Sequence, residues 1–219
     1  MPRSPRLEYP DALYHVTTRG VQRSAIYLDD TDRDSFLALV ARTLTSGNAR
    51  AFAFCLMGNH YHLVLQTGDA NLSTLMRRIN SAYGLAFNRR HARCGHVFEG
   101  RFHAVHVDRD AYLLEVCRYV DLNPVQAALC DSPAQWAWSS YGAHVGIARV
   151  PPWLATAGLH GALMGQEPRD AVEIDASRRR YASWVEEGRE VRLWKRPLLD
   201  GRFLGDRAFV RRVEAHARE

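Results

Sequence analysis

The stretch AFAFCLMGNHYHLVLQT, from Ala51 to Thr67, decides the fold. Its two halves, 51–57 and 60–67, are rich in apolar, aromatic and β-branched residues, as strands are. The Gly58-Asn59 pair between them is a turn signal, and so short a connection joins neighbouring strands into an antiparallel hairpin. The stretch therefore predicts two paired strands.

The segments on either side predict the rest of a sheet and its helices. Apolar residues recur at helical spacing in three segments, and two more segments have the composition of strands. In chain order these are a strand over 13–19, a helix over 31–45, a helix over 72–90, a strand over 104–107 and a helix over 108–123. With the hairpin, the order is β-α-β-β-α-β and then a helix. We therefore predict an α+β fold of the ferredoxin-like, split β-α-β type, an antiparallel sheet with helices on one face.

The chain changes character after Val150-Pro151-Pro152. Beyond this point the helical patterns, over 178–187 and 206–219, are short and are interrupted by glycine and proline. We therefore predict a main domain over 7–145 and a mostly helical C-terminal extension over 151–219, to which the sequence assigns no role.

The composition excludes several classes of protein. Hydrophobic residues make up 47% of the 219 residues and charged residues 24%, which is typical of a globular chain and not of a disordered or fibrous one. No apolar run approaches the roughly 20 residues of a membrane span, and no apolar stretch follows the basic start, so we expect a cytoplasmic protein without a membrane segment. The four widely spaced cysteines predict reduced thiols.

Positive charge is concentrated in one part of the chain. Six arginines and one acid lie between Asn71 and Val107, which equals the whole net charge of +5. Such a patch suits a polyanion such as nucleic acid, although an arginine-rich helix face in solvent is the alternative. The candidate contact residues are Arg77, Arg78, Arg89 and Arg90, which would bind phosphates, and Arg101 and Phe102, which would clamp and stack a single strand.

Four residues could carry chemistry. His60 and His62 are two apart in a predicted strand, so their imidazoles share one face and make half of a metal site. Tyr119 and Asn123 are four apart in a predicted helix, which places a phenol and an amide one turn apart on one face. Each of these residues also has a purely structural interpretation. The two histidines could lie at the edge of a core, Tyr119 could be a core aromatic, and Asn123 could be the N-cap of a further helix over Pro124–Leu129.

At this point the residues resemble a known family. MGNHYHL, from Met57 to Leu63, is similar to the His-hydrophobic-His signature of HUH single-tyrosine transposases, and RYVDLNPVQA, from Arg118 to Ala127, resembles the tyrosine segment of REP-associated tyrosine transposases. GHVFEGRF (95–102) and WAWSSY (136–141) resemble family blocks in the same order, and the resemblance covers about 7–145.

This chain departs from the family pattern at three positions. Tyr61 is bulkier than the usual aliphatic residue between the two histidines, and Gly58 stands where many relatives have proline. Neither change touches an expected ligand. Asp121 stands where some relatives have a histidine or tyrosine, and its carboxylate could lie on the surface or approach the metal, so its role stays open.

The resemblance implies a mechanism. His60, His62 and Asn123 would hold a divalent ion, Mg²⁺ or Mn²⁺, and Tyr119 would attack a phosphate of single-stranded or hairpin DNA, forming a 5′-phosphotyrosine link and releasing a 3′-hydroxyl. A phenol is only about one part in a thousand ionised at pH 7. A metal that polarises the phosphate offsets this handicap.

Two other functions fit the same residues. A DNA-binding regulator could keep the fold and the basic patch without cleavage, and an RNA-processing endonuclease would cleave without a covalent protein adduct. The family contains monomers and dimers, so a homodimer is compatible with the sequence.

Overall fold

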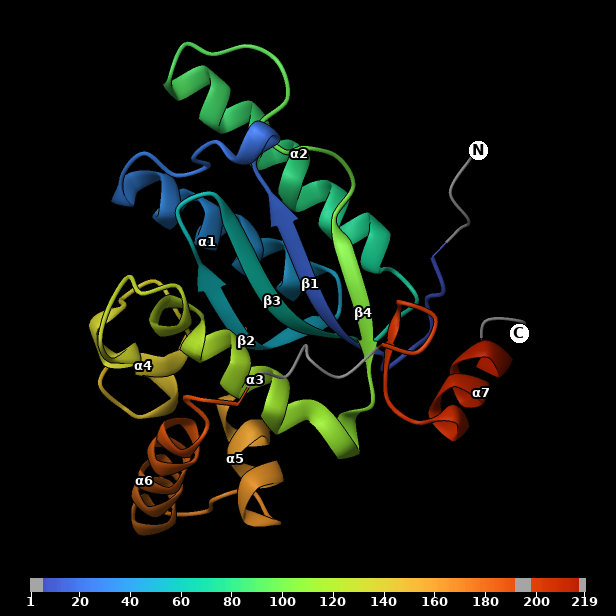
Figure 1. Ribbon diagram of the computed structural model, residues 1–219, viewed down its shortest axis with the longest axis vertical. Coiled ribbons are helices and arrows are strands. Elements are labelled where there is room, and N and C mark those ends of the chain that lie inside the picture. The colour runs from blue at the N-terminus through green and yellow to red at the C-terminus, as the bar shows by residue number, and fades with distance from the viewer. Residues whose placement is uncertain (1–5, 192–197, 217–219) are drawn as a thin grey trace.

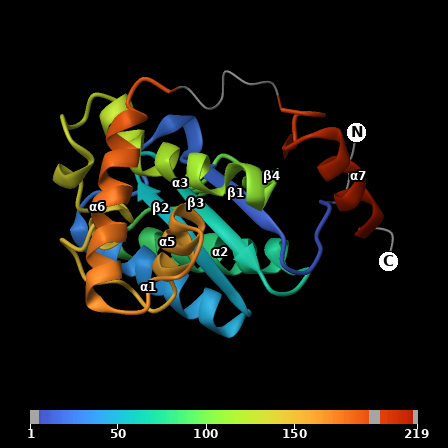
Figure 2. The ribbon, with the colours of Figure 1, turned by 90° about the horizontal axis from the view of Figure 1, so that it is seen from below.

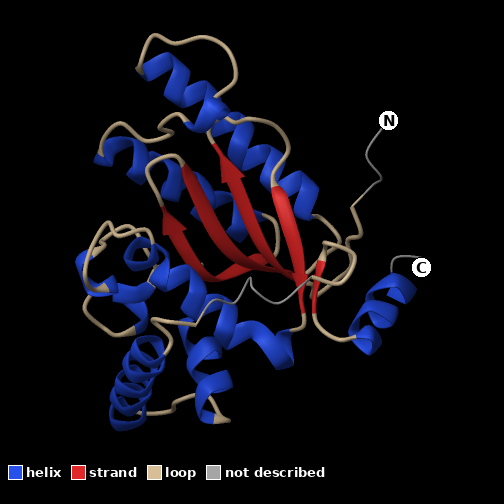
Figure 3. Ribbon diagram, viewed as in Figure 1, coloured by secondary structure: helices blue, strands red, loops and turns tan. Residues whose placement is uncertain are grey.

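The hairpin expected over 51–67 lies within the sheet, paired on one side with a third strand. The computed structural model describes residues 6–191 and 198–216. Five strands form one sheet in the order β2-β3-β1-β4-β5 (Figures 1 and 3). Their bounds are β1 Leu13–Arg19, β2 Ala49–Leu56, β3 His60–Thr67, β4 His103–Val107 and β5 Phe203–Leu204. The first four strands pair antiparallel in the ferredoxin-like order, as the sequence predicts.

The fifth strand corrects the prediction of a wholly antiparallel sheet. β5 pairs in parallel with β4, with His106 opposite Phe203 and Val107 opposite Leu204. The sheet is therefore mixed. A strand of two residues has no alternation to read, so the sequence gives no sign of it.

Helices cover both faces of the sheet, and not one face as predicted. The helices are α1 Asp30–Ser46, α2 Leu72–Arg90, α3 Arg109–Gln126, α4 Tyr141–His144, α5 Thr156–Met164, α6 Ala171–Glu187 and α7 Arg207–His216, with single 3-10 turns at Val21–Arg23 and Pro133–Gln135. The core on one face is built with α1 and α2, and the core on the other with α3, α5 and α6. Figure 2 shows α2 and α3 on opposite sides of the strands. The prediction holds for α1 and α2 only, because the strands are apolar on both faces.

The alternation of β3 sets which side chains face which core. Tyr61 and Leu63 belong to the core under α1 and α2, whereas Val64 belongs to the core under α3. Tyr61 is fully buried, 4.7 Å from Phe36 between ring centroids, and its hydroxyl donates to Asn80 Oδ1 at 2.5 Å. The bulky residue between the two histidines therefore fills the core, and this fixes both imidazoles on the opposite face.

Helix α3 runs through Pro124, which corrects the expected break at Asn123. The predicted helix over 124–129 does not form separately, and Asn123 is not an N-cap, because Pro124 lies in the last turn of α3. Proline has no N–H and therefore removes one hydrogen bond of the helix. The helix tolerates this loss because it ends two residues later, and Ala128 then takes a left-handed conformation at φ 56°. Tyr119 and Asn123 consequently lie on one continuous helix.

The C-terminal helices share a core with α3. Leu159 of α5 and Tyr181 of α6 belong to the cluster that contains Val116 and Val120 of α3. Helix α6 contains the predicted helix over 178–187, and α7 contains most of 206–219, of which 217–219 lie outside the described residues. The division into 7–145 and 151–219 stays a prediction.

A buried carboxylate fastens α6 to α3. Asp121 is fully buried and accepts hydrogen bonds from Ser140 Oγ at 2.5 Å and Tyr181 Oη at 2.8 Å, with His144 Nδ1 at 3.0 Å. Asp121 is therefore neither on the surface nor directed at the histidine pair. The four cysteines are free thiols, as predicted, and in the described ranges no helix has the length and apolar character needed to cross a bilayer.

We expect Tyr181→Phe to lower the free energy of unfolding by about 1–3 kcal/mol, because it leaves a buried carboxylate short of one donor. Urea denaturation would measure the change. Tyr112→Phe on α3 is the matched control, since the Tyr112 hydroxyl has no hydrogen bond to the described residues. An equal loss in both variants would contradict the role given to Asp121.

Candidate active site

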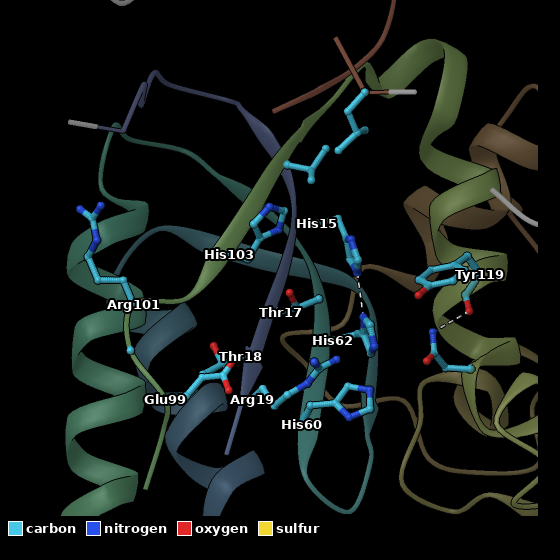
Figure 4. Close-up of a pocket in the computed structure, with 14 residues that line it drawn as sticks. His15, Thr17, Thr18, Arg19, His60, His62, Glu99, Arg101, His103 and Tyr119 are labelled. Atoms are coloured by element: carbon cyan, nitrogen blue, oxygen red, sulfur yellow. Dashed lines mark hydrogen bonds between the residues drawn. The ribbon is translucent and has the colours of Figure 1, made fainter. Parts of the chain in front are cut away.

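A polar pocket of about 510 Å³ lies between the sheet and α3 (Figure 4). It is lined by side chains from β1, β3, β4, α3 and the loop before β4. Its polar lining residues are His15, Thr17, Thr18, Arg19, His60, His62, Glu99, Arg101, His103, Tyr119 and Asn123. All four residues with predicted chemistry therefore meet in one cavity.

The pairing of β1 with β3 places the histidines. Arg19 is the partner of His60 in this register, and Thr17 is the partner of His62. The two imidazoles meet edge to face with ring centroids 5.1 Å apart. His62 is buried and bonds through Nδ1 to His15 Nε2 at 2.9 Å, while His60 Nδ1 lies 2.7 Å from Asn59 Oδ1.

Burial keeps the imidazoles of His15, His60 and His62 neutral at pH 7. Desolvation, with a smaller effect of Arg19, lowers the pKa of His60 to about 4. Desolvation, helped by His15, His60 and Arg19, lowers the pKa of His62 well below its usual value. The pKa of His15 falls to about 3 by burial and the nearby His103. A histidine must be neutral to bind a metal, so this state suits a ligand pair.

Helix α3 supplies the other two residues. The Tyr119 side chain projects from α3 toward His15 and His62 (Figure 4), with ring centroids 5.8 Å and 5.7 Å away. One turn further on, Asn123 donates from Nδ2 to the Tyr119 carbonyl at 3.3 Å. Because the amide nitrogen makes this bond, the amide oxygen of Asn123 is the atom left to act as a ligand.

The chemistry of the donor set fits a divalent ion. His62 Nε2 is buried and has no hydrogen-bond partner in the described parts of the chain, and such a nitrogen costs stability unless something pairs with it. Two neutral imidazoles and an amide oxygen are suitable ligands for Mn²⁺ and related ions. No group of three His, Cys, Asp or Glu side chains is arranged to hold a metal ion within 6–191 and 198–216, and the third donor of this set is an amide.

The predicted DNA-contact residues have different surroundings. Arg77, Arg78, Arg89 and Arg101 are exposed. Arg90 instead pairs with Asp29 and Asp32, both at 2.6 Å, and these acids lie about sixty residues earlier in the chain. Phe102 is buried, with the Arg6 guanidinium 3.7 Å from its ring centroid. Those four side chains are accessible to a ligand, whereas Arg90 is exposed but held in two ion pairs, and Phe102 is buried.

Several pocket residues are not predicted by the sequence analysis, and three of them carry an imidazole or a guanidinium next to the predicted residues. His15 and Arg19 line the pocket from β1, and His103 lines it from β4. A signal exists for the first two. In LYHVTTR the polar residues His15, Thr17 and Arg19 alternate with the core residues, which places them on one face of the strand.

Fold and site together define a class of protein. It is a ferredoxin-like α+β domain in which a histidine pair on the sheet faces a tyrosine on the helix that follows the fourth strand. The family model for IS200-like transposases matches residues 8–123, which is more than half of the chain and includes all four residues with predicted chemistry. The chain belongs to the IS200-like transposase family.

Two solved structures are similar to this chain. A REP-associated tyrosine transposase bound to a REP hairpin has a TM-score of 0.57 and 16% identity, over 71% of this chain and 92% of that one. This match confirms the fold. A transposase candidate from Deinococcus radiodurans R1 has a TM-score of 0.39 and 13% identity, over 55% of this chain and 96% of that one. No curated protein matches the chain.

We expect the free energy of unfolding to fall as the pH drops from 6.5 toward 4. Histidines of the unfolded chain bind protons near pH 6.5, whereas folded His60 and His15 bind them only near pH 4 and pH 3. The contribution of these two histidines to the free energy of unfolding is therefore fully present above pH 6.5 and is lost as the pH falls. His15 contributes at most about 1.4 kcal/mol per pH unit.

Urea unfolding at pH 7.5, 6 and 5 without metal measures this slope. These pH values lie above the range in which carboxylates such as Asp29 titrate, because the hydrogen bond from the Arg90 guanidinium lowers the pKa of Asp29 to about 2. His15→Gln removes one of the contributing histidines, so its slope should be shallower. An unchanged slope in that variant would show that His15 is protonated as easily in the folded state as in the unfolded one.

Proposed function

We propose that this protein cleaves and rejoins single-stranded DNA, with Tyr119 as the nucleophile and a divalent ion, Mg²⁺ or Mn²⁺, held by His60, His62 and Asn123. One observation carries the proposal. Tyr119 projects from α3 into the pocket that the histidine pair lines, and its ring lies 5.7 Å from the ring of His62. Phosphoryl transfer depends above all on such positioning of the nucleophile.

The reaction exchanges one phosphodiester for another. The Tyr119 oxygen forms a bond to phosphorus and releases its proton to solvent, while the P–O3′ bond breaks and O3′ takes up a proton. The DNA is left with a 3′-hydroxyl and a 5′-phosphotyrosine link. Attack by a 3′-hydroxyl on that link reverses the step and joins strands without ATP. The bound ion supplies Lewis-acid polarisation of the phosphate.

Two arginines of the pocket supply positive charge for the phosphate. Arg19 lies opposite His60 in the β1–β3 register, and Arg101 lies on the loop before β4. Because His15, His60 and His62 are neutral at pH 7, the arginines carry the cationic charge of the pocket. A guanidinium binds phosphate oxygens in pairs, so Arg19 is suited to hold the scissile phosphate beside the histidines.

A neighbouring groove provides a path for the strand. It has a volume of about 980 Å³, lies between α2 and the 95–102 loop, and shares Glu99, Gly100 and Arg101 with the catalytic pocket. Arg77 and Phe98 also line it. A cationic groove with an aromatic side chain suits an unpaired strand, whose phosphates and bases it can bind together. Since a REP hairpin is bound by the structural relative, a hairpin with a single-stranded flank is the substrate proposed here.

We expect a covalent protein–DNA adduct when the chain is incubated with hairpin oligonucleotides that carry single-stranded flanks, in the presence of Mn²⁺. Denaturing gels would detect it. The adduct should be absent with Tyr119→Phe or with chelator, and present with Tyr112→Phe, the same change on the same helix.

The other outcomes favour the other functions. Binding without an adduct over many strands would favour a DNA-binding regulator. Cleavage of RNA that survives Tyr119→Phe would favour an RNA-processing endonuclease and would remove Tyr119 from the chemistry.

We expect Arg77→Ala and Arg101→Ala to weaken binding of the same hairpins and to reduce the salt slope of log K by about one unit each, since each loses one phosphate contact. Fluorescence anisotropy at several salt concentrations measures both quantities. Arg179→Ala, an equal loss of charge at an exposed site on α6, should leave the slope unchanged. A similar slope in all variants would place the DNA elsewhere.

A further inference from the structure

We propose that His15 and Asn59 are positioning residues that set the tautomers of His62 and His60, so that both ligands offer an Nε2 lone pair to the same pocket. This inference rests on the metal site of the proposed function. It concerns two side chains outside the ligand set, one on β1 and one in the turn before β3.

The turn side chain determines the proton of His60. Asn59 Nδ2 donates to the Arg23 carbonyl at 3.0 Å, and because a carbonyl only accepts, the amide must point its nitrogen that way. Asn59 Oδ1 then faces His60 Nδ1 at 2.7 Å. An amide oxygen also only accepts, so Nδ1 of His60 carries the proton and donates it. The lone pair of His60 is therefore on Nε2.

The turn itself is fixed by the backbone. Gly20 N–H donates to the Asn59 carbonyl at 2.8 Å, and Ile26 N–H donates to the Gly58 carbonyl at 3.0 Å. These bonds tie the Gly58-Asn59 turn to the end of β1 and to the segment that follows it. The Asn59 amide thus belongs to a turn with little freedom to reorient.

The strand side chain determines the proton of His62. Its Nδ1 lies 2.9 Å from His15 Nε2, and the two rings are within 3° of parallel, so one nitrogen must donate to the other. If Nε2 of His62 carried the proton, a buried N–H would have no partner in the described structure. With the proton on Nδ1, His62 donates to His15, and Nε2 keeps a lone pair for the ion.

His15 is well placed to hold this arrangement. It is buried, and its ring also meets the Tyr119 ring edge to face at 5.8 Å between centroids. One side chain therefore contacts both a ligand and the nucleophile. Groups that hold the far nitrogen of a ligating histidine usually contribute about 10–100-fold to metal affinity or activity.

The first test measures Mn²⁺ binding to the full chain without DNA. The decrease of the free-ion signal in electron paramagnetic resonance gives the amount of bound ion. We expect His15→Leu and Asn59→Ala each to weaken binding about 10–100-fold. His15→Gln, which can place an amide oxygen as acceptor, should restore most of the affinity. His106→Leu is the control, a buried histidine on β4 whose ring contacts Tyr9, Tyr14 and Phe203.

The second test reads the tautomers directly. Long-range ¹H–¹⁵N spectra of the metal-free protein should show the Nδ1–H form for both His60 and His62. His15→Leu should change the pattern of His62 alone, and Asn59→Ala that of His60 alone. Thermal unfolding confirms that each variant is folded, and the wild-type spectrum tests the inference even where a variant is not.

The outcomes separate this inference from the proposed function. An Nε2–H form of His62 in the wild type, or wild-type Mn²⁺ affinity in folded His15→Leu, would overturn the positioning role and leave the tyrosine chemistry intact. Absence of Mn²⁺ binding by the wild type would overturn the metal site and this inference with it, and the adduct experiment would then decide whether Tyr119 acts without the ion.

Discussion

The pairing of β1 with β3 is the constraint on which the site depends. In a strand each residue takes the face opposite to its neighbours, so the burial of Tyr61 under α1 and α2 forces His60 and His62 to the other face. The same register brings Arg19 beside His60 and places His15 where its ring can bond to His62. A slip of one residue would put the imidazoles into an aromatic core and Tyr61 into the pocket. The hydrophobic core and the placement of the two imidazoles are therefore set by one alternation of side chains along β3.

The second half of the site depends on the docking of α3. One side of this helix buries Val116, Cys117 and Val120 against the sheet, and Asp121 bonds to Ser140 and Tyr181. With the helix held on these sides, Tyr119 and Asn123 lie one turn apart over the histidine pair. The C-terminal helices thus contribute to the site at a distance, because Tyr181 of α6 holds the carboxylate that lies between the two site residues in the sequence.

Local patterns predict the strands over 13–19 and 60–67 and the helix over 72–90 with the bounds that the structure has. They also place His60 with His62, and Tyr119 with Asn123, on common faces. What they miss depends on partners far along the chain. The sequence predicts Arg90 as a contact for DNA, but in the fold Asp29 and Asp32 lie beside it and form ion pairs with it. The two residues of β5 form a strand because they pair with the edge of β4. Pro124 predicts the end of a helix, but α3 continues through it. One missing backbone hydrogen bond in the last turn costs little when the preceding turns of α3 pack against the core.

Burial connects the electrostatics of the pocket with its chemistry. Desolvation favours the neutral form of an imidazole, so the same packing that orders His15 and His62 lowers their pKa and keeps both imidazoles unprotonated. The guanidinium groups of Arg19 and Arg101, by contrast, lie at the exposed rim of the pocket. The pocket therefore combines two properties, neutral imidazole nitrogens on the side of the sheet and positive charge at its exposed rim. A phosphodiester bridged to a divalent ion is a ligand that uses both, whereas a free cation or a neutral molecule would use one at most.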